Sequence, residues 1–237
     1  MAILILYYSK VNTSKKIFIV MPAYNEWSKI ESVIDELRQW WFLNIVVADD
    51  WSKDNTRAIL KKTWVYFASH QINRWAWAAT QTWIDLALSL WADIVVTIDA
   101  DWQHYPEDAM NLANEITAWW WDVVIWSRFL EKRKVPFLRK VFNRIWNIIT
   151  WFFFWAYVTD SQSWLKAFSR SALEKIKIES NWFEFCSEII QKIHVYDLKF
   201  KEIPISVKYT EYSQSKWQNF FNWVKTVWKL ALHSLIK

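Results

Sequence analysis

Short apolar runs alternate with longer amphipathic stretches from Ile17 onward. Five apolar runs predict strands, and they cover residues 17–21, 44–48, 65–68, 93–98 and 122–125. Helices are expected between them, over residues 28–39, after Asp54, over residues 76–90 and from Pro106, because proline suits the first turn of a helix. Buried strands that alternate with helices are typical of an α/β domain. We therefore expect a three-layer α/β/α sandwich with a mostly parallel mixed sheet.

The pattern changes after Ser127. Residues 129–140 are basic and aromatic, and the following uncharged run, Ile145 to Val158, is too short to span a bilayer but suits a helix on a membrane surface. The alternative is a buried core helix flanked by a solvated basic loop. Residues 216–237 again combine apolar residues at helical spacing with lysines. We expect one domain over 1–237, in which 1–15 form an extension and 129–158 and 216–237 are candidate membrane-surface helices.

The composition limits the classes of binding partner that we expect. The formal net charge is +5, which favours phosphates, nucleic acid or acidic lipid headgroups. Nucleic acid is not expected, because the sequence has no helix-turn-helix, zinc or aromatic-strand motif. The single cysteine, Cys186, excludes an internal disulfide and fits a reducing compartment, so a cytoplasmic location is expected.

Glycine and tryptophan have abnormal counts. Glycine is absent, whereas average usage predicts roughly 16 glycines in a chain of this length. Tryptophan occurs 22 times, often at turns and helix ends where a left-handed backbone or a close backbone approach is commonly needed, as at Trp27, Trp51 and Trp102. We interpret most of these tryptophans as occupying glycine positions, either through a reassigned codon or through deliberate substitution. The alternative is a protein that is naturally rich in tryptophan, for example at a carbohydrate-binding surface.

Acidic motifs follow three of the expected strands. They are Pro22-Ala23-Tyr24-Asn25-Glu26, Asp49-Asp50-Trp51-Ser52 and Asp99-Ala100-Asp101. The carboxyl ends of parallel strands meet at one edge of a sheet, where ligands bind in such folds. Each motif alone is weak, because Asp-x-Asp more often marks a solvated turn, but the three together indicate a binding site.

The chemistry of these residues suits a diphosphate. Asp99 and Asp101 can hold a hard divalent cation such as Mg²⁺ or Mn²⁺, which would neutralise charge on a departing nucleoside diphosphate. Asp49 is better placed to accept hydrogen bonds from a base or ribose. Pro22 and Tyr24 would form an apolar wall beside the base. By contrast, His70 is isolated in the sequence and is interpreted as a surface or core residue.

These motifs give the chain a family resemblance. From about Lys16 to Val227 it resembles family 2 glycosyltransferases of the GT-A fold, especially the dolichyl- and polyprenyl-phosphate mannosyl- and glucosyltransferases. Further segments that carry the resemblance are Gln103-His104-x-Pro106, Ser127-Arg128-Phe129, Asp160-Ser161-Gln162-Ser163-x-Leu165-Lys166, Glu202-Ile203-Pro204-Ile205 and Ser215-Lys216. The glycines that the family would show in these motifs are tryptophans in this chain.

The resemblance implies roles for particular residues. The nucleotide-sugar site would be formed by Pro22, Tyr24, Glu26, Val47, Asp49, Asp50, Asp99, Ala100 and Gln103. Asp99 and Asp101 would flank the metal and, with Arg128 and Lys216, form the catalytic set. The side chains of Arg128 and Lys216 would contact diphosphate or acceptor phosphate. Asp160 and Gln162 would lie near the acceptor, and 184–193 would form a helix that closes the site.

The implied activity is inverting transfer of a hexose from a GDP- or UDP-sugar to a polyprenyl phosphate, on the cytoplasmic face of a membrane or with a membrane-protein anchor. A phosphate acceptor is already anionic near neutral pH and needs no strong base. The main alternative is transfer to a sugar hydroxyl, which requires a base, with Asp160 as the candidate. If the tryptophans are physically present, an inactive nucleotide-binding or membrane scaffold is a further alternative.

Overall fold

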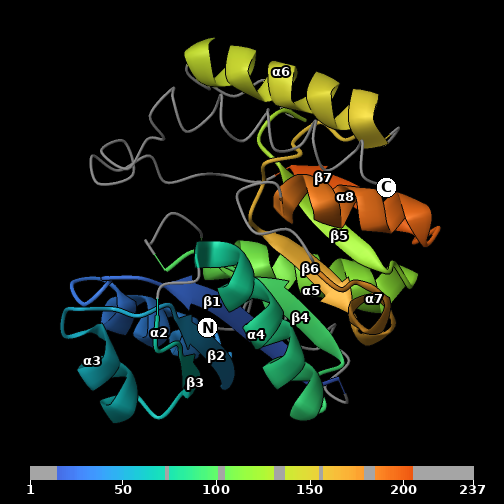
Figure 1. The fold of residues 1–237 in the computed structure, drawn as a ribbon. Helices are drawn as coiled ribbons and strands as arrows, with labels where there is room; N and C mark the ends of the chain where they lie inside the picture. The colour runs from blue at the N-terminus through green and yellow to red at the C-terminus, as the bar shows by residue number, and fades with distance from the viewer. Residues whose placement is uncertain are drawn as a thin grey trace.

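The computed structural model describes residues 15–72, 75–100, 105–130, 137–154, 157–178 and 185–204. Seven strands form one sheet in the order β3-β2-β1-β4-β6-β5-β7 (Figure 1). Their bounds are β1 Ile17–Ala23, β2 Asn44–Asp49, β3 Tyr66–Ser69, β4 Ile94–Thr97, β5 Val123–Ser127, β6 Lys166–Ser169 and β7 Phe200–Pro204. All neighbouring pairs are parallel except those that β6 makes with β4 and β5.

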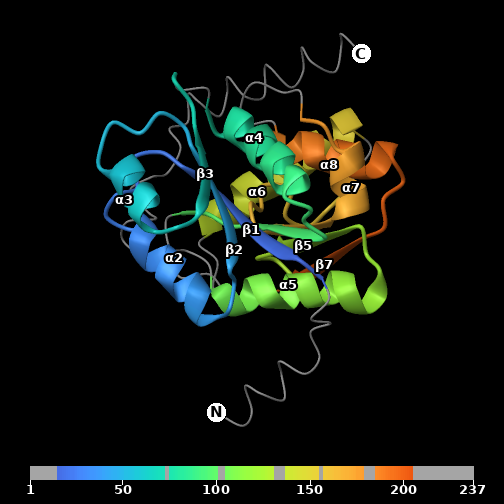
Figure 2. The ribbon, with the colours of Figure 1, turned by 90° about the horizontal axis from the view of Figure 1, so that it is seen from below.

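Helices cover both faces of this sheet (Figure 2). On one face lie α2 (Ile30–Gln39), α3 (Thr56–Lys62) and α5 (Pro106–Trp119), and on the other lie α4 (Trp75–Ser89), α7 (Arg170–Lys175) and α8 (Phe185–Val195). Alternate residues of a strand serve the two faces, so that Ile19 and Met21 pack with the first group while Phe18 and Val20 pack with the second. The predicted three-layer fold with a mixed sheet is confirmed.

The expected elements up to β5 occur within two residues of their predicted bounds. Strand β6 was not predicted, because its four residues begin with a lysine and carry no apolar run. Lys166 is nevertheless buried, and β6 fills the gap between β4 and β5. This inserted antiparallel strand brings the segment before it, residues 157–165, to the edge of the sheet where the parallel strands end.

Helix α6 (Phe137–Phe154) lies above α8 and β7, outside the layers (Figure 1). Its inward face carries the buried residues Asn143, Trp146, Asn147 and Thr150, whereas its outward face exposes Val141, Ile148, Trp151 and Phe152. Lys140 and Arg144 are also exposed. The helix is therefore not an enclosed core helix. Across the ranges that the structure describes, no helix combines the length and apolar character needed to cross a membrane.

Tryptophans end the helices that precede strands. Trp41, Trp64, Trp91 and Trp120 follow α2, α3, α4 and α5, and their φ angles lie between 53° and 64°. At α2, Trp41 N–H donates to the Arg38 carbonyl and Phe42 N–H to the Leu37 carbonyl, which is the Schellman pattern that usually takes glycine. The backbone at these positions is the one that glycine adopts at least cost.

The predicted glycine-like backbone is confirmed at Trp51, whose φ is 66°. Trp27 does not share it, because its φ is not positive, and Trp102 lies outside the described residues. Trp83 shows a different cost, since it is buried in the core on α4 and its indole N–H has no hydrogen-bond partner. A side chain of this size with an unpaired donor is unusual in a core position.

Candidate active site at the carboxyl edge of the sheet

The acidic motifs reach the same edge of the sheet. Asp49 ends β2 in register with Ala23 of β1, and Ile98 N–H donates to the Val20 carbonyl just before Asp99. Strand β1 lies between the other two, so the backbones of Asp49 and Asp99 are separated by about two strand spacings, roughly 10 Å. That separation suits opposite ends of a nucleotide-sized ligand.

Asp49 is completely buried and is already paired. Its Oδ1 accepts the Ser52 N–H at 3.1 Å, and its Oδ2 accepts from Arg57 Nε at 3.1 Å. The Arg57 side chain is 37% exposed, so it covers Asp49 from the solvent side. A base or ribose would therefore meet Asp49 at the lone pairs that remain, or after Arg57 has moved.

The loops after β1 and β2 are bonded to each other. Asn25 N–H donates to Ser52 Oγ, Lys53 N–H donates to Asn25 Oδ1, and Glu26 N–H donates to Thr56 Oγ1, each at 2.9 Å. Asn25 takes a left-handed φ of 56°, which turns the chain sharply after the strand. The two loops consequently form one support for the expected nucleotide site.

Asp54 lies between this loop support and the start of α3 at Thr56. Its Oδ1 accepts the Thr56 N–H at 2.9 Å and its Oδ2 accepts the Trp27 N–H at 3.3 Å. Burial raises the pKa of Asp54, but hydrogen bonds from the Thr56 side chain and from the Thr56 and Trp27 backbones outweigh it, so the pKa is lowered. The N-cap residue of α3 is Asn55, so the Thr56 contact of Asp54 is a local turn bond just before the helix and not a capping bond.

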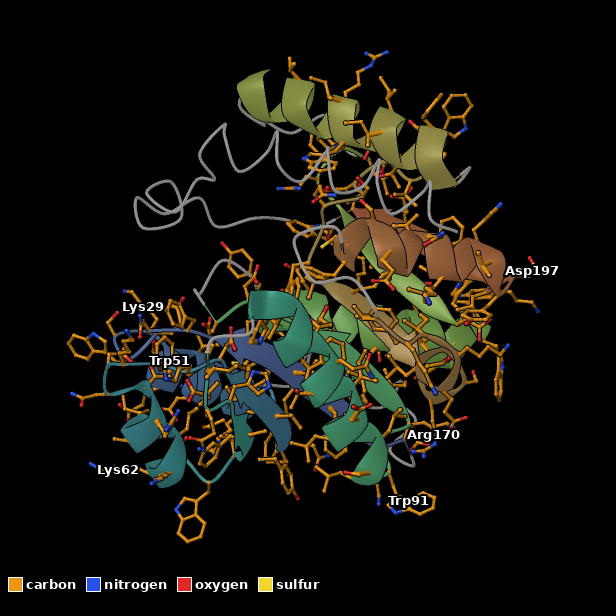
Figure 3. All side chains as sticks on the ribbon, viewed as in Figure 1. Lys29, Trp51, Lys62, Trp91, Arg170 and Asp197 are labelled. Carbon is orange, nitrogen blue, oxygen red and sulfur yellow. The ribbon has the colours of Figure 1, made fainter. Side chains whose placement is uncertain are left out.

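Aromatic side chains stand at the rim of these loops. Tyr24 is exposed, and Trp51 is held with its ring 4.3 Å from Lys53 Nζ. Lys29 and Trp51 lie at the same end of the molecule (Figure 3). Pro22 is half-buried, whereas Val47 and Ala100 are buried in the core, so their side chains face away from the solvent side of the edge.

His70 is hydrogen-bonded at this edge as a partly buried structural residue, although it is isolated in the sequence. Its Nδ1 lies 2.9 Å from Asp50 Oδ1, its Nε2 lies 2.9 Å from Thr82 Oγ1, and its N–H donates to the Asp49 carbonyl. His70 follows β3, the neighbour of β2, and its position directly after an expected strand was the available signal. Asp50 is thereby held by His70, and its own N–H donates to the Ala23 carbonyl of β1.

Arg128 and Asp160 meet at the end of β5. Arg128 donates from Nε to Asp160 Oδ2 at 2.7 Å and from Nη2 to Oδ1 at 2.8 Å, and its backbone N–H donates to Oδ2 at 3.2 Å. Asp160 is fully buried, while the Arg128 side chain is 21% exposed. The carboxylate orients the guanidinium in a bidentate pair and leaves it accessible at the surface of the site.

Thr159 anchors the segment that carries Asp160. Its N–H is shared by both carboxylate oxygens of Glu202, at 2.9 and 3.0 Å, and its hydroxyl donates to Glu202 Oε1 at 2.9 Å. Ser127 Oγ lies 2.6 Å from the same hydroxyl. Burial raises the pKa of Glu202, and the hydrogen bonds from Thr159 reduce that rise without cancelling it.

Lys166 places a buried amine beneath the site, where sequence reasoning assigned it no role. Its ammonium donates to the Ser163 carbonyl. Burial lowers the pKa of Lys166, and its charge interacts favourably with Asp160 and Asp99. Burial also raises the pKa of Cys186 to about 11, which keeps this thiol protonated. A lysine at the start of a short run gave no sequence signal for burial.

The remaining predicted residues divide by position. Gln162 lies beside α8 and donates from Nε2 to Ser187 Oγ at 3.3 Å. Glu26 is buried in the loop support, and the helix expected over 184–193 is α8. Asp101, Gln103 and Lys216 lie outside the described residues.

Asp99 offers the oxygen chemistry that a hard cation takes. It follows β4 at the edge where the other strands end, and it is half-buried. In the part of the chain that the structure describes, no three histidine, cysteine, aspartate or glutamate side chains gather as a metal site. Asp99 thus fits the expected Mg²⁺ or Mn²⁺ as one ligand, and the second carboxylate of the motif, Asp101, belongs to the range left undescribed.

This geometry agrees with the comparisons with known proteins. Residues 18–177 match the profile of the family described as "Glycosyl transferase family 2". The chain belongs to this family and is a glycosyltransferase of the GT-A fold.

Individual relatives are more specific. The chain is 34% identical to a UDP-N-acetylglucosamine–dolichyl-phosphate N-acetylglucosaminyltransferase of Methanococcus voltae, over 92% of this chain and 96% of that protein. It is 24% identical to a polyprenol monophosphomannose synthase of Mycolicibacterium smegmatis, over 85% of this chain and 80% of that protein. Among solved structures, glucosyl-3-phosphoglycerate synthase from Mycobacterium tuberculosis, in complex with Mn²⁺, UDP and glucosyl-3-phosphoglycerate, shares the fold with a TM-score of 0.66 at 18% identity, over 94% of this chain and 80% of that one.

Proposed function

We propose that this glycosyltransferase moves a hexose from a nucleoside-diphosphate sugar to a polyprenyl phosphate. The observation that carries the proposal is the Arg128–Asp160 pair: a partly exposed cation lies at the carboxyl edge, and the carboxylate beside it is fully buried with both oxygens bonded. Such a site favours an acceptor that brings its own negative charge. The relatives named for dolichyl-phosphate and polyprenol substrates support the same acceptor class.

We infer that the reaction is an inverting displacement, as the family resemblance implies. An acceptor phosphate oxygen forms a bond to the anomeric carbon while the bond from that carbon to the diphosphate breaks, and the electron pair leaves with the nucleoside diphosphate. The acceptor carries between one and two negative charges near pH 7 and has no proton to lose during attack. The work of the protein is therefore positioning and charge neutralisation.

Chain residues divide this work between donor and acceptor. The loop support around Asn25 and Thr56 would hold the nucleotide, and Asp99, with Asp101, would hold Mg²⁺ or Mn²⁺. The bound cation would supply neutralisation of the diphosphate charge. Arg128 would bind the acceptor phosphate in the orientation that Asp160 sets.

The competing activity, transfer to a sugar hydroxyl, requires a base that can reach the acceptor. Asp160 was the candidate, but its carboxylate is enclosed and held by Arg128. Its placement therefore favours the phosphate acceptor over the hydroxyl acceptor.

Matched acceptors test the proposal. The protein is incubated with radiolabelled UDP- or GDP-hexoses, Mg²⁺ or Mn²⁺, and either a polyprenyl phosphate or the polyprenol of the same chain length. We expect chloroform-soluble label with the phosphate and none with the alcohol. Label that appears only in water-soluble glycan when a sugar acceptor is added would favour the hydroxyl activity. No transfer to any acceptor would favour the inactive scaffold.

We further propose that the outward face of α6 lies on the membrane that holds the acceptor. Ile148, Trp151 and Phe152 are exposed on a helix whose polar Asn143 and Asn147 point inward, the reverse of a helix that faces water on its outer side. Exposed Lys140 and Arg144 favour anionic headgroups.

Vesicle binding tests this placement of α6. A Trp151→Glu/Phe152→Glu double variant should lose co-sedimentation with vesicles of phosphatidylcholine and phosphatidylglycerol. Trp91→Glu is the control, because Trp91 is an exposed tryptophan at the end of the molecule opposite α6 (Figures 1 and 3). Equal binding by both variants and the parent protein would show that α6 does not dock on lipid.

A further inference from the structure

The inward face of α6 is bonded to the backbone on both sides of Asp160. Asn147 Nδ2 donates to the Thr159 carbonyl at 2.7 Å, and Asn147 Oδ1 accepts the Ser161 N–H at 3.1 Å. Asn143 Nδ2 donates to the same Thr159 carbonyl at 2.8 Å. A single amide side chain thus spans the residue whose carboxylate holds Arg128.

Burial makes these bonds energetically important. Asn143 and Asn147 are each more than nine-tenths buried, and Asp160 and Ser161 are fully buried. A buried backbone N–H or carbonyl that loses its partner is costly, and a buried charge that shifts relative to its partner is costlier. Loss of the Asn147 amide would leave the Ser161 N–H unpaired and would remove one of the two α6 amides that hold the Thr159 carbonyl.

A second anchor holds the same segment from strand β7. Glu202 on β7 receives the N–H and the hydroxyl of Thr159. The Thr159 N–H is therefore hydrogen-bonded to the sheet, and the Thr159 carbonyl is hydrogen-bonded to α6. The backbone of segment 159–161 is thus held in place by hydrogen bonds from two elements, although the segment lies in no helix or strand.

We propose that Asn147, assisted by Asn143, is a positioning residue for the acceptor phosphate. It fixes the backbone around Asp160, Asp160 fixes the Arg128 guanidinium, and Arg128 binds the phosphate. The inference rests on the proposed function, and it makes α6 a part of the active site as well as a surface helix. Asn147 does not contact substrate and acts only through Asp160 and Arg128.

Kinetics with a short-chain, water-soluble polyprenyl phosphate separate this role from membrane binding. Asn147→Leu should lower kcat/KM for the acceptor by on the order of 10²-fold, since misplacement of a binding group by about 1 Å has that effect. The donor KM should stay unchanged. Asn143→Leu removes only one of the two donors to Thr159 and should cost less. Asn114→Leu, the same change on α5, should alter neither kinetic constant.

A double-mutant cycle with Asp160→Asn tests whether Asn147 acts through Asp160. A merely structural role for Asn147 would give no coupling between the two substitutions in kcat/KM. If Asn147 acts through Asp160, then Asn147→Leu should cause almost no further loss of kcat/KM in the Asp160→Asn background. Losses that multiply in the double variant, or equal losses for donor and acceptor, would overturn the proposal. Circular dichroism and Tm of each variant identify any that fail to fold, in which case Asn143→Leu carries the same cycle.

The parent protein separates the two hypotheses. If it transfers no sugar to the polyprenyl phosphate, the proposed function fails. If it transfers sugar and both asparagine variants keep the acceptor kcat/KM, only the positioning role fails.

Discussion

Asp160 lies beneath Arg128 with no solvent exposure, and the two side chains share a pair of hydrogen bonds of 2.7 and 2.8 Å. The pair is asymmetric, because the guanidinium reaches solvent and the carboxylate does not. Removal of either partner should therefore have unequal consequences. The residue that keeps contact with water can be rehydrated, whereas the enclosed residue cannot.

We expect Arg128→Gln to destabilise the protein more than Asp160→Asn does. Arg128→Gln leaves an enclosed carboxylate without its cation, at a cost of about 3 kcal/mol or more. Asp160→Asn leaves a partly exposed guanidinium and should cost clearly less. Chemical denaturation of both variants at neutral pH measures the difference, and an equal or reversed order would contradict the asymmetry. Both variants should have a lower, still measurable, kcat/KM for the acceptor.

Glu202 gives a stability prediction with a definite sign. Its pKa is raised above the ordinary value of 4.5 by burial, so the folded state binds the proton more tightly than the unfolded chain. The free energy of unfolding should then fall as pH rises from 4.5 through the raised pKa, because the carboxylate must ionise in a buried place. Glu202→Gln has no such proton. The stability difference between the parent protein and this variant should shift in favour of the parent as pH is lowered from 7 to 4.5.

Denaturant titrations across that pH range check the sign. A difference that stays constant with pH would show that Glu202 does not titrate differently in the folded state. A difference that shifts toward the variant on acidification would show a lowered pKa instead.

The sequence predicted the part of the fold that consists of regular βα units. Strand β2 is an apolar run that ends in an acidic residue, and β1 and β4 are apolar runs that acidic residues follow within three positions, so both the elements and the shared edge could be inferred. Strand β6 could not, because its buried Lys166 is compensated by the neighbouring Ser163 carbonyl and by the charges of Asp160 and Asp99, which the sequence pattern does not place beside it. The bonds of Asn143 and Asn147 were equally hidden, because the helix pattern records apolar spacing and not the backbone that an amide will meet.

The acidic edge predicts a dependence on divalent metal. Asp99→Asn should raise the concentration of Mg²⁺ or Mn²⁺ needed for half-maximal transfer and lower the maximal rate, because a neutral amide is a weaker ligand for a hard cation. Asp101→Asn should abolish transfer. Chelation with EDTA should stop the parent enzyme, and added metal should restore it.

Asp93→Asn is the matched control, since Asp93 lies at the other end of β4. Its carboxylate accepts the Lys16 N–H at 2.8 Å and is remote from the strand end that carries Asp99. The metal requirement of Asp93→Asn should equal that of the parent protein. Activity that persists in EDTA would remove the cation from the proposed site.

The left-handed tryptophans predict that glycine would stabilise the fold. Trp120 has φ 57° and ψ 37° directly after α5, and it is largely exposed, so its side chain gains little from packing. The left-handed conformation costs a residue with a Cβ about 1 to 2 kcal/mol relative to glycine. Trp120→Gly should therefore increase the free energy of unfolding by about 1 kcal/mol, which chemical denaturation can resolve.

Trp119→Gly separates the backbone effect from the loss of an exposed indole. Trp119 precedes Trp120, is similarly exposed, and is the last residue of α5, so its backbone is helical. Glycine there should destabilise by about 0.5 kcal/mol, since it is a weaker helix former than tryptophan. Opposite signs at two adjacent, equally exposed tryptophans would show that the backbone at 120 is built for glycine. Because Trp41, Trp64 and Trp91 have the same conformation after α2, α3 and α4, replacement by glycine should stabilise at each of them as well. Equal effects at 119 and 120 would show instead that the exposed indole, and not the left-handed backbone, determines stability at these helix ends.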